Sequence, residues 1–363
     1  MIIDKIDAFP LTIPFGAGAA LPGPSRPPAV TSLLVRVRTD EGHEGWGEAF
    51  AFEGAQVTRR ALEDLVAPLC AGQDATRTGP LMRAAQQKLH VFGRGGAVMH
   101  ALSAVDTALW DIAGKAARVP LHRLLGGAGA PDLPCYASLD PYGEAAAVRA
   151  GVTQALAAGF TDVKLHERAP AAVRAAREAA GPATGLMLDV NCPWTLAQAT
   201  EMAAQFRGQR LRWLEEPLWP PEDYDGLARL RAACGIPLAA GENAAAPLDF
   251  GRLLAAPAVD YVQPSPAKMG GVSELARVFT LAAARNVTVM PHTFYHGPGL
   301  LAAVHAAAAL GTPDTMIEWR YTDLAARPYG DAVQPDGGRI RLPQGPGLGA
   351  DPDPDVLRRY GDR

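Results

Sequence analysis

The sequence predicts an α/β protein built around a closed parallel (β/α) barrel, and three observations lead to this prediction. Short apolar runs of strand-like composition recur between residues 134 and 315, at intervals of about 25 residues, a period typical of a strand followed by a helix. Most intervals hold a helical pattern, as at Ala171–Ala180 and Ser273–Ala284. Several runs end in an ionisable residue, and the C-terminal ends of barrel strands are where such barrels build their active sites.

Length and composition narrow the class of protein. The chain has 363 residues, enough for one barrel and a smaller domain. The formal net charge of −4 gives no basic surface for nucleic acid, and no apolar run is long enough to span a membrane. The four cysteines form no CxxC pair, and the first residues lack an apolar signal core. We therefore expect a cytoplasmic protein with reduced thiols that binds neither nucleic acid nor membranes.

The first part of the chain combines strands with helices. Strand-like segments are expected at Ile2–Leu11, Ser32–Thr39 and Gly45–Phe52. Between the first two lies Pro14–Pro28, rich in Gly, Ala and Pro, for which a surface loop and a lid over a site are equally open interpretations. A helical region follows, and its last helix is expected over Gly96–Ala117, where apolar residues recur at helical spacing.

The chain after the last strand is rich in Pro and Gly and is expected to run back over the first domain. The expected domains are therefore residues 1–125, a barrel over residues 126–320, and a C-terminal segment over residues 321–363.

Three successive strand-like runs each end in a carboxylate: Asp189, Glu215 and Glu242. Packing alone gives no reason for an acid at three strand ends, although one of the three acids could be a surface or salt-bridged residue. Three oxygen ligands without Cys or His suit a hard octahedral cation, Mg²⁺ first and Mn²⁺ second. We expect the three carboxylates to bind one such ion, with its other positions open to water and substrate oxygens.

Acid/base residues flank the expected metal. Lys164 and His166 are two residues apart, so on one strand both side chains face the same side. Two roles stay open for Lys164, a base with a lowered pKa or a holder of a substrate carboxylate, while His166 suits acid/base work. His292 stands several strands away and would approach the substrate from the opposite side. Such a site would remove a proton next to a carboxylate, and a metal ion would stabilise the resulting enolate.

Three sequence motifs carry a family resemblance. They are the helix Ala104–Lys115 before the barrel, the stretch Leu186–Pro217 from Asp-x-Asn to Glu-Glu-Pro, and the turn Lys268–Gly271 after strand 6. On these motifs the chain resembles, over nearly its whole length, the mandelate racemase/muconate lactonizing enzyme family of the enolase superfamily. The resemblance implies a modified TIM (β/α)7β barrel with an α+β capping domain formed by the N- and C-terminal segments.

The resemblance also implies roles for individual residues. By position, the family's three Mg²⁺ ligands fall on Asp189, Glu215 and Glu242, its Lys-x-Lys motif on Lys164 and His166, its strand-7 catalytic histidine on His292, and its carboxylate-binding strand-8 glutamate on Glu318. Asn191, Ser265 and Tyr295 are further expected substrate-binding residues, although Tyr295 is equally well interpreted as a loop residue on the way to the next helix. The family implies a homo-oligomer, with specificity set by Pro14–Pro28 and the turn near Phe50–Ala55.

Two departures from the family pattern are informative. The second position of the lysine motif is His166, and Ser265 stands where the pattern has an aspartate paired with the strand-7 histidine. Without that carboxylate an imidazolium at His292 is less stabilised, so His292 is expected to be a weaker base that serves better as an acid or a neutral donor. Lys268 lies three residues beyond position 265 and is expected to be structural, which argues against an epimerase with two lysine bases.

The expected function is Mg²⁺-dependent dehydration of a sugar acid or a related α-hydroxy acid. His166 or Lys164 would remove the proton α to the carboxylate, and His292 would assist loss of the β-hydroxyl. A racemase, epimerase or cycloisomerase on a carboxylate substrate is the first alternative, and a ligand-binding relative without catalysis is the second. A zinc hydrolase and a serine hydrolase are disfavoured, because the sequence has neither an HExxH nor a GxSxG motif.

Overall fold

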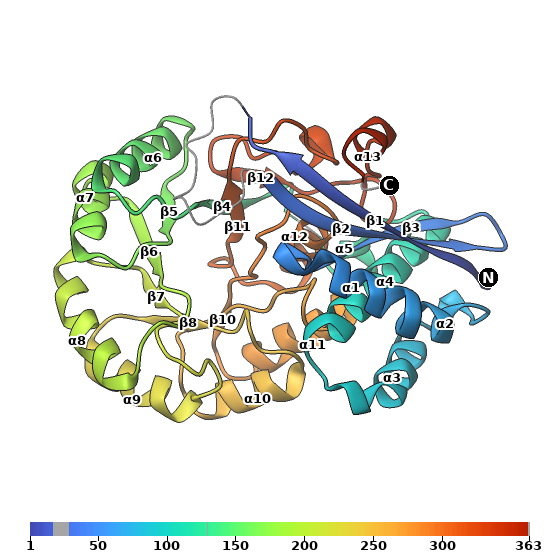
Figure 1. The fold of residues 1–363 in the computed structure, drawn as a ribbon, viewed down its shortest axis with the longest axis horizontal. Coiled ribbons are helices and arrows are strands. Elements are labelled where there is room, and N and C mark those ends of the chain that lie inside the picture. Colours follow the sequence, from blue (N-terminus) through green and yellow to red (C-terminus); the bar gives the residue numbers. More distant parts are fainter. Residues whose placement is uncertain (17–28, 129, 362–363) are drawn as a thin grey trace.

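The computed structural model describes residues 1–16, 29–128 and 130–361. Two sheets organise these residues, one of three strands and one of nine (Figure 1). Among the described residues, no helix combines the length and the apolar character that crossing a membrane requires.

The three-stranded sheet comes from the start of the chain. Its strands are β1 (Ile3–Pro14), β2 (Ala29–Thr39) and β3 (Glu44–Ala49), antiparallel and in chain order. All three strands were predicted, with bounds that differ by a few residues. Of the predicted loop Pro14–Pro28, Pro14 ends β1 and residues 17–28 lie outside the described residues.

A group of helices follows this sheet in the chain, and its first and fourth members pack on the strands. They are α1 (Ala55–Ala61), α2 (Ala67–Cys70), α3 (Thr78–Lys88) and α4 (Gly96–Ala117), followed by the short α5 (Leu121–Leu124). The predicted bounds of α4 are those observed. This helix packs so closely on β3 that a Cβ atom at Gly47 would lie 1.8 Å from the carbonyl oxygen of Ala104. Glycine is therefore required at this position of the strand.

The rest of the chain forms the barrel. Its parallel strands are β4 (Asp132–Leu139), β5 (Asp162–Leu165), β6 (Gly185–Asp189), β7 (Trp213–Glu215), β8 (Leu238–Ala240), β9 (Tyr261–Val262), β10 (Thr288–Val289) and β11 (Ile317–Tyr321). The helices between them are α6 (Ala145–Ala157), α7 (Pro170–Ala180), α8 (Leu196–Phe206), α9 (Tyr224–Cys234), α10 (Pro247–Ala255), α11 (Gly271–Ala283) and α12 (Pro298–Leu310). Hydrogen bonding runs from β10 through β9 to β4 and then to β11, and no ladder joins β10 to β11 within the described part of the chain. Eight strands and seven intervening helices are the predicted (β/α)7β barrel.

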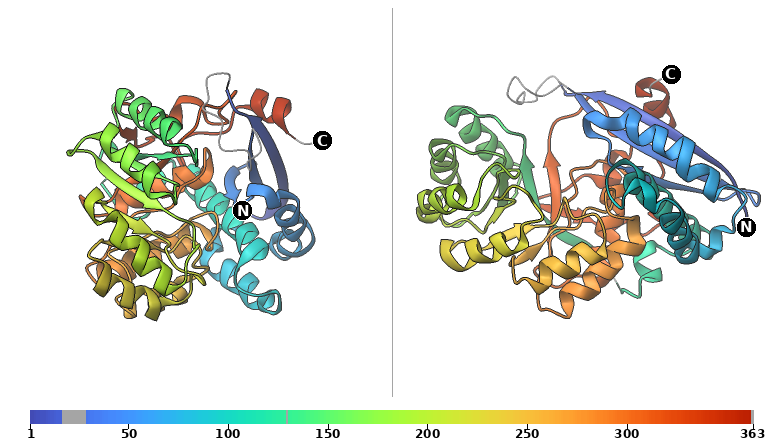
Figure 2. Two further views of the ribbon diagram at one scale, coloured as in Figure 1. Left: turned by 60° about the vertical axis from the view of Figure 1, so that its left-hand side comes forward. Right: turned by 60° about the horizontal axis from the view of Figure 1, so that its bottom comes forward.

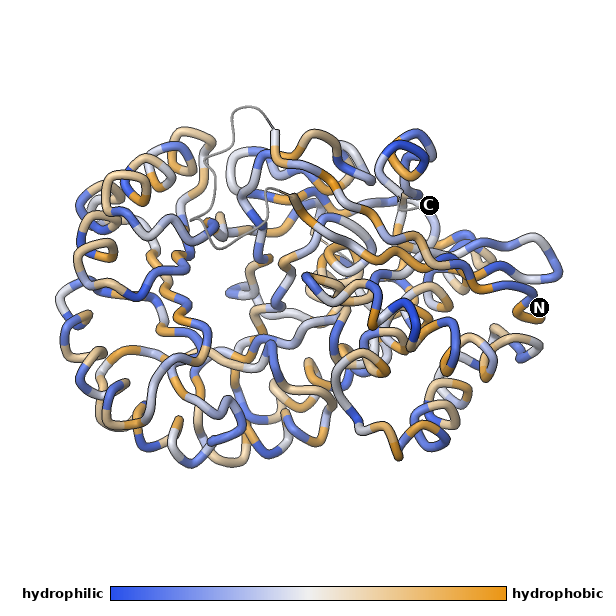
Figure 3. Tube along the Cα trace, viewed as in Figure 1, coloured by the Kyte–Doolittle hydropathy of each residue, from blue (hydrophilic) through white to orange (hydrophobic). Residues whose placement is uncertain are grey.

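Strand alternation separates two apolar layers in the barrel. Leu186 and Leu188 of β6 face the surrounding helices, whereas Met187 faces the barrel axis and joins a small interior cluster with Trp213 and Met290. The helices outside the barrel show the matching pattern, with hydrophobic and hydrophilic residues on opposite sides (Figure 3). The interior is therefore filled by side chains below the level at which the strands end.

The end of the chain returns to the N-terminal part. After β11, strand β12 (Arg339–Arg341) pairs with the start of β4. Helix α13 (Pro354–Tyr360) lies beside β1, and Gly361, directly after it, forms an isolated β-bridge with Leu11. The views in Figure 2 show the three-stranded sheet and its helices standing against one side of the barrel. The domain boundaries at residues 125 and 320 stay a prediction.

Candidate active site

Side chains along each barrel strand point alternately inward and outward, and this alternation brings polar side chains together where the strands end. Lys164 of β5 and His166, the first residue after β5, follow the inward direction. On β6 and β7 the inward residues Met187 and Trp213 are followed two residues later by Asp189 and Glu215. Apolar inward residues thus fill the barrel, and polar ones follow at the strand ends. The inward directions of Lys164, His166, Asp189 and Glu215 therefore follow from this alternation.

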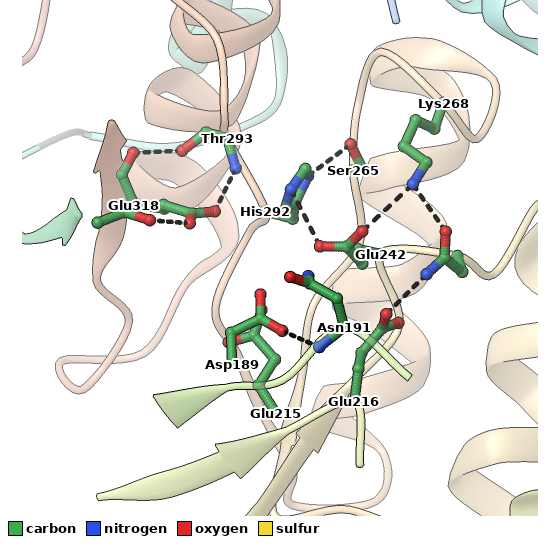
Figure 4. A network of polar contacts seen from close by, with 12 residues as sticks. Asp189, Asn191, Glu215, Glu216, Glu242, Ser265, Lys268, His292, Thr293 and Glu318 are labelled. Carbon is green, nitrogen blue, oxygen red and sulfur yellow. Dashed lines mark hydrogen bonds and ion pairs between the residues drawn. The ribbon is translucent and has the colours of Figure 1, made fainter. Parts of the chain in front are cut away.

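Glu242 reaches the same place by breaking the alternation. Ala239 faces the barrel interior, so an unbroken strand would point residue 241 inward and residue 242 outward. Residue 241 is Gly241 with φ +133°, a conformation that L side chains rarely adopt. The turn in the backbone directs the Glu242 carboxylate toward Asp189 and Glu215 (Figure 4).

The three predicted metal ligands form one cluster. A carboxylate oxygen from each of Asp189, Glu215 and Glu242 lies within 4.8 Å of the other two. Asp189 and Glu215 are buried, and Glu242 is partly exposed. Burial raises the pKa of Glu215 well above its ordinary value, and Lys164 only partly opposes this effect. Three oxygen donors, concentrated negative charge and no sulfur or imidazole donor in the set fit a hard divalent cation.

Lys164 supplies the positive charge inside this cluster. Its fully buried ammonium lies 2.7 Å from Glu215 Oε1, 2.9 Å from Glu318 Oε1 and 3.3 Å from Asp189 Oδ2. Burial alone would lower the pKa of Lys164, but the three carboxylates raise it well above its ordinary value. Among these carboxylates the pKa of Lys164 is therefore raised, and a lowered pKa of Lys164 beside a bound cation stays a prediction.

His166 has one ring nitrogen held and one directed into the site. Its Nδ1 lies 2.5 Å from the carbonyl oxygen of Leu139, and its Nε2 lies 3.3 Å from Asp189 Oδ2. A carbonyl oxygen only accepts hydrogen bonds, so Nδ1 carries the proton and, in the neutral ring, Nε2 has a free lone pair. A proton taken up by Nε2 would then be shared with Asp189.

His292 faces the cluster from the other side of the barrel. Its Nε2 lies 3.1 Å from Glu242 Oε2, and its Nδ1 lies 3.0 Å from Ser265 Oγ (Figure 4). Burial lowers the pKa of His292, and the neighbouring Glu242 and Glu318 do not fully offset this. The predicted contact between positions 265 and 292 is therefore present, with a hydroxyl in place of a carboxylate.

Glu318 of β11 lies next to Lys164 and is fully buried. It accepts hydrogen bonds from Ser138 Oγ at 2.7 Å and from the backbone N–H of Thr293 at 3.0 Å, and it pairs with Lys164. Burial would raise the pKa of Glu318, but Lys164 foremost, together with His292 and Ser138, lowers it to about 2. The charged form of Glu318 is therefore favoured, and it pairs with the Lys164 ammonium.

The other predicted substrate-binding residues differ in position. Asn191 follows β6 with φ +52°, is exposed, and donates its backbone N–H to Asp189 Oδ1 at 2.9 Å. Tyr295 is buried and its phenol oxygen is hydrogen-bonded to Ser265 Oγ. The structure thus joins Tyr295 to His292 through Ser265, which the loop interpretation did not anticipate.

Sequence reasoning missed a polar network beside Glu242. The Lys268 ammonium lies 3.5 Å from Glu242 Oε1 and donates to Asn243 Oδ1 at 3.0 Å, and Asn243 Nδ2 donates to Glu216 Oε2 at 2.7 Å. Cys192 Sγ also donates to Glu216, at 3.1 Å. Lys268 was expected to be only structural, but its charge faces a predicted metal ligand. The helical turn after Ser265 brings it back to the site, which strand spacing cannot indicate.

The N-terminal sheet meets the barrel next to Tyr295. A cavity lies there between the N-terminal sheet and the barrel, and its lining includes Ser32, Glu48, Phe50, Phe294, Tyr295 and Arg320. Phe50 donates its backbone N–H to the carbonyl oxygen of Ala267 at 3.0 Å, which fixes the start of the predicted specificity turn against the barrel. That this turn sets specificity stays a prediction.

Comparison with known proteins places this fold and site in a class. Residues 147–356 match the family of enolase C-terminal domain-like proteins, and residues 28–126 match the N-terminal domain of the mandelate racemase/muconate lactonizing enzymes. The chain is a member of the enolase superfamily. Within it, the chain belongs to the mandelate racemase/muconate lactonizing enzyme family, as predicted from its motifs.

The relatives name several related reactions. D-galactarolactone cycloisomerase of Agrobacterium fabrum is 31% identical over 350 residues, which cover 90% of each chain. D-galactonate dehydratase of Verminephrobacter eiseniae is 34% identical over 275 residues, which cover 72% of this chain and 71% of the relative. The prediction of an enzyme from a family of sugar-acid dehydratases and cycloisomerases is confirmed by these relatives.

Solved structures agree with this assignment. The 3,6-anhydro-D-galactonate cycloisomerase of Zobellia galactanivorans superposes with a TM-score of 0.87 at 31% identity, with all of both chains covered. A racemase of Streptomyces coelicolor with bound magnesium superposes with a TM-score of 0.88 at 27% identity, covering 99% of this chain and 100% of the other. The predicted fold class is confirmed. Magnesium is bound in a structural relative, and its ligands in this chain are a matter for proposal.

Proposed function

We propose that this protein binds Mg²⁺ through Asp189, Glu215 and Glu242 and dehydrates a sugar acid. The reaction begins with removal of the proton α to the substrate carboxylate and continues with loss of the β-hydroxyl as water. The enol that results takes up a proton at the β-carbon and becomes the 2-keto acid. The carboxylate cluster, the names of the relatives and the two unlike histidines across the site support this proposal. When bound, the ion would stabilise the negative charge that develops on the carboxylate oxygens.

His166 is the proposed base. The observation that carries this choice is the hydrogen bond from Nδ1 to the carbonyl oxygen of Leu139, which leaves Nε2 as the free acceptor facing the site. Lys164 is a poorer base here, because three carboxylates stabilise its ammonium form. We assign Lys164 to orienting and neutralising the substrate carboxylate, with Glu318 holding the ammonium in place.

His292 is the proposed donor to the leaving group. It stands across the site from His166, with Nε2 next to Glu242 and Nδ1 next to Ser265. Its lowered pKa favours the neutral ring near neutral pH, which matches the expectation of a weak base at this position. Removal of the α-proton and help to the departing oxygen would thus come from opposite sides.

The direct test is a panel of aldonates and aldarates incubated with the purified protein and Mg²⁺, read by formation of a 2-keto-3-deoxy acid. Dehydration is expected of at least one member, and it should be lost in His166→Asn. A protein that binds Mg²⁺ but releases keto acid from no member would contradict dehydration. Unchanged cellular function in both His166→Ala and His292→Ala would instead support a ligand-binding role without catalysis.

Ring-opening cycloisomerisation is the second candidate, and Ser265 favours it. A hydroxyl departs as water and must take up a proton, so dehydration uses the His292 ring when it is protonated on both nitrogens, whereas a ring carboxylate of a lactone departs with a hydrogen bond alone. A neutral His292 next to a serine suits the second case, and one relative is named as a lactone cycloisomerase. The same panel extended to sugar-acid lactones and anhydro sugar acids, followed by proton NMR, distinguishes an isomer of unchanged mass from a dehydrated product.

Two further expectations remain predictions. The cytoplasmic location is one, and assembly into a homo-oligomer is the other. Size-exclusion chromatography with light scattering measures the assembly directly. A mass of two or more times 38.1 kDa is expected, and a mass of 38.1 kDa would contradict the prediction.

A further inference from the structure

Three buried groups form a chain of hydrogen bonds behind the site. His292 Nδ1 lies 3.0 Å from Ser265 Oγ, and Ser265 Oγ is in turn hydrogen-bonded to the phenol oxygen of Tyr295. Ser265 is fully buried, and His292 and Tyr295 are each only 5% exposed. Water therefore has little access to these atoms, and each hydrogen must be shared within the chain.

The direction of the chain follows from counting donors. Burial raises the pKa of Tyr295 well above its ordinary value, so the phenol keeps its proton. In the described part of the chain, Ser265 Oγ is the hydrogen-bond partner of that phenol. If the serine hydroxyl pointed at Tyr295, the phenol proton would be buried without an acceptor, which is unfavourable. The phenol therefore donates to Ser265, and the serine proton is directed to His292 Nδ1.

The other end of the chain agrees with this direction. His292 Nε2 lies 3.1 Å from Glu242 Oε2, and a carboxylate oxygen accepts hydrogen bonds. A proton on Nε2 satisfies that contact, whereas a lone pair on Nε2 would face a negatively charged oxygen. Tyr295, Ser265, His292 and Glu242 then form a series in which every donor has an acceptor.

We infer that Tyr295 and Ser265 are positioning residues that hold His292 as the neutral tautomer with its proton on Nε2. His292 therefore presents a hydrogen-bond donor to the site and has no free lone pair there. His166 is held in the opposite tautomer by the Leu139 carbonyl. An aspartate at position 265 would accept a proton from Nδ1 and free the Nε2 lone pair.

The consequence for catalysis rests on the proposed function. If His166 removes the α-proton, a site with His292 in this tautomer has one base and one donor. Such a site takes the proton from one face of the substrate only, which excludes racemisation by two bases. Ser265→Asp should introduce the missing base, because the aspartate would turn His292 into an acceptor.

Histidine tautomers can be measured without any substrate. The test uses enzyme labelled with ¹⁵N in the histidine rings, with Mg²⁺ alone added, and long-range ¹H–¹⁵N correlation spectra at pH 8. The His292 signals are those absent from His292→Asn. The expected wild-type pattern is a protonated Nε2 and an unprotonated Nδ1. The reverse pattern would overturn the inference, whatever reaction the enzyme proves to catalyse.

Variants test the two positioning residues. Tyr295→Phe removes the phenol proton and frees Ser265 to accept, so a population protonated on Nδ1 should appear; Ser265→Ala should also mix the tautomers, and Ser265→Asp should invert them. Tyr329→Phe is the matched control, because Tyr329 is a buried phenol with no hydrogen-bond partner among the described residues. An unchanged His292 pattern in both Tyr295→Phe and Ser265→Ala would overturn the inference even if the variants are folded.

Kinetics give an independent readout once a substrate is known. Tyr295→Phe is expected to lower kcat about 10-fold with little change in KM, since the tautomer matters for proton transfer and not for binding. Ser265→Asp should in addition allow solvent deuterium into the α-position of the epimer that the wild-type enzyme leaves unexchanged. If the proposed reaction is absent altogether, these rates are lost but the NMR result stands by itself.

Discussion

The two sides of the candidate site use different chemistry. The charged half, formed by Lys164, His166, Asp189 and Glu215, holds an ammonium among carboxylates. The hydroxyl half, formed by Ser265, His292 and Tyr295, contains hydroxyl groups and one imidazole. Each half contains one histidine, and each histidine is fixed through Nδ1, by a backbone carbonyl on one side and by a serine on the other.

This difference explains how two histidines in one site acquire separate roles. A carbonyl can only accept, so it leaves His166 with a free lone pair on Nε2, whereas a serine held by a phenol donates and leaves His292 with a proton on Nε2. The pKa of His292 is lowered because burial outweighs the attraction of Glu242 and Glu318. Tautomer and position, more than residue type, therefore distinguish the proposed base from the proposed donor.

The largest effect is expected in the charged half, from Asp189→Asn. The amide removes one negative charge from the proposed metal ligands and leaves Lys164 with fewer partners. We expect kcat/KM to fall about 10³-fold or more, since a bound ion contributes several kcal/mol to stabilising the transition state. Calorimetry should show weaker Mg²⁺ binding in parallel. Glu201→Gln, an exposed acid on α8, is the control, and wild-type Mg²⁺ affinity in Asp189→Asn would contradict the assignment.

The next largest effect is expected from His166→Asn. Loss of the proposed base should lower the rate of α-proton exchange with solvent deuterium about 10²- to 10⁴-fold, while Mg²⁺ affinity stays close to wild type. Lys164→Met is the comparison: if it abolishes exchange and His166→Asn does not, the base is Lys164 and the roles within the charged half are reversed.

A smaller effect is expected from His292→Asn in the hydroxyl half. Product formation should fall about 10²-fold, because the departing oxygen loses its donor. Deuterium exchange at the α-carbon should persist near the wild-type rate, because the base lies on the other side. Loss of exchange together with product formation would show that the two halves do not divide the reaction in this way.

Much of the charged half was accessible from sequence, and in the hydroxyl half the pairing of Ser265 with His292 was accessible but the link to Tyr295 was not. Lys164 and Asp189 lie on strands whose alternation of inward and outward side chains dictates their direction, and His166 directly follows one such strand. The same rule places Ser265 next to His292. Glu242 points inward because Gly241 breaks that rule, so its prediction depended on the acid being the third in a series and on the family resemblance. Tyr295 and Lys268 reach the site through a loop and a helical turn, and their directions depend on tertiary packing. The raised pKa of Lys164 likewise depends on distances to three carboxylates from three strands.

The smallest effect is expected at Glu48 of the N-terminal sheet, beside the hydroxyl half. It concerns stability and not chemistry. Glu48 is buried, and burial raises its pKa to about 7, although hydrogen bonds from Gly299 and Ser32 oppose this rise. In the folded state Glu48 thus keeps its proton to a higher pH than it does in the unfolded state. The stabilisation linked to this proton is complete below pH of about 4.5 and is lost as the pH rises to about 7.

Glu48→Gln keeps an acceptor for Gly299 and removes the titration, so it isolates this contribution. The variant should gain up to about 3 kcal/mol of unfolding free energy relative to wild type on going from pH 4.5 to pH 8, by the usual conversion of a pKa shift. Urea unfolding of both proteins at the two pH values measures this difference. Burial also raises the pKa of Asp106 to about 7, but its contribution cancels because both proteins contain Asp106. If the difference in unfolding free energy between the two proteins did not depend on pH, Glu48 would be ionised in the folded protein. The uncharged groups of the hydroxyl half would then end at Tyr295 and would not include Glu48.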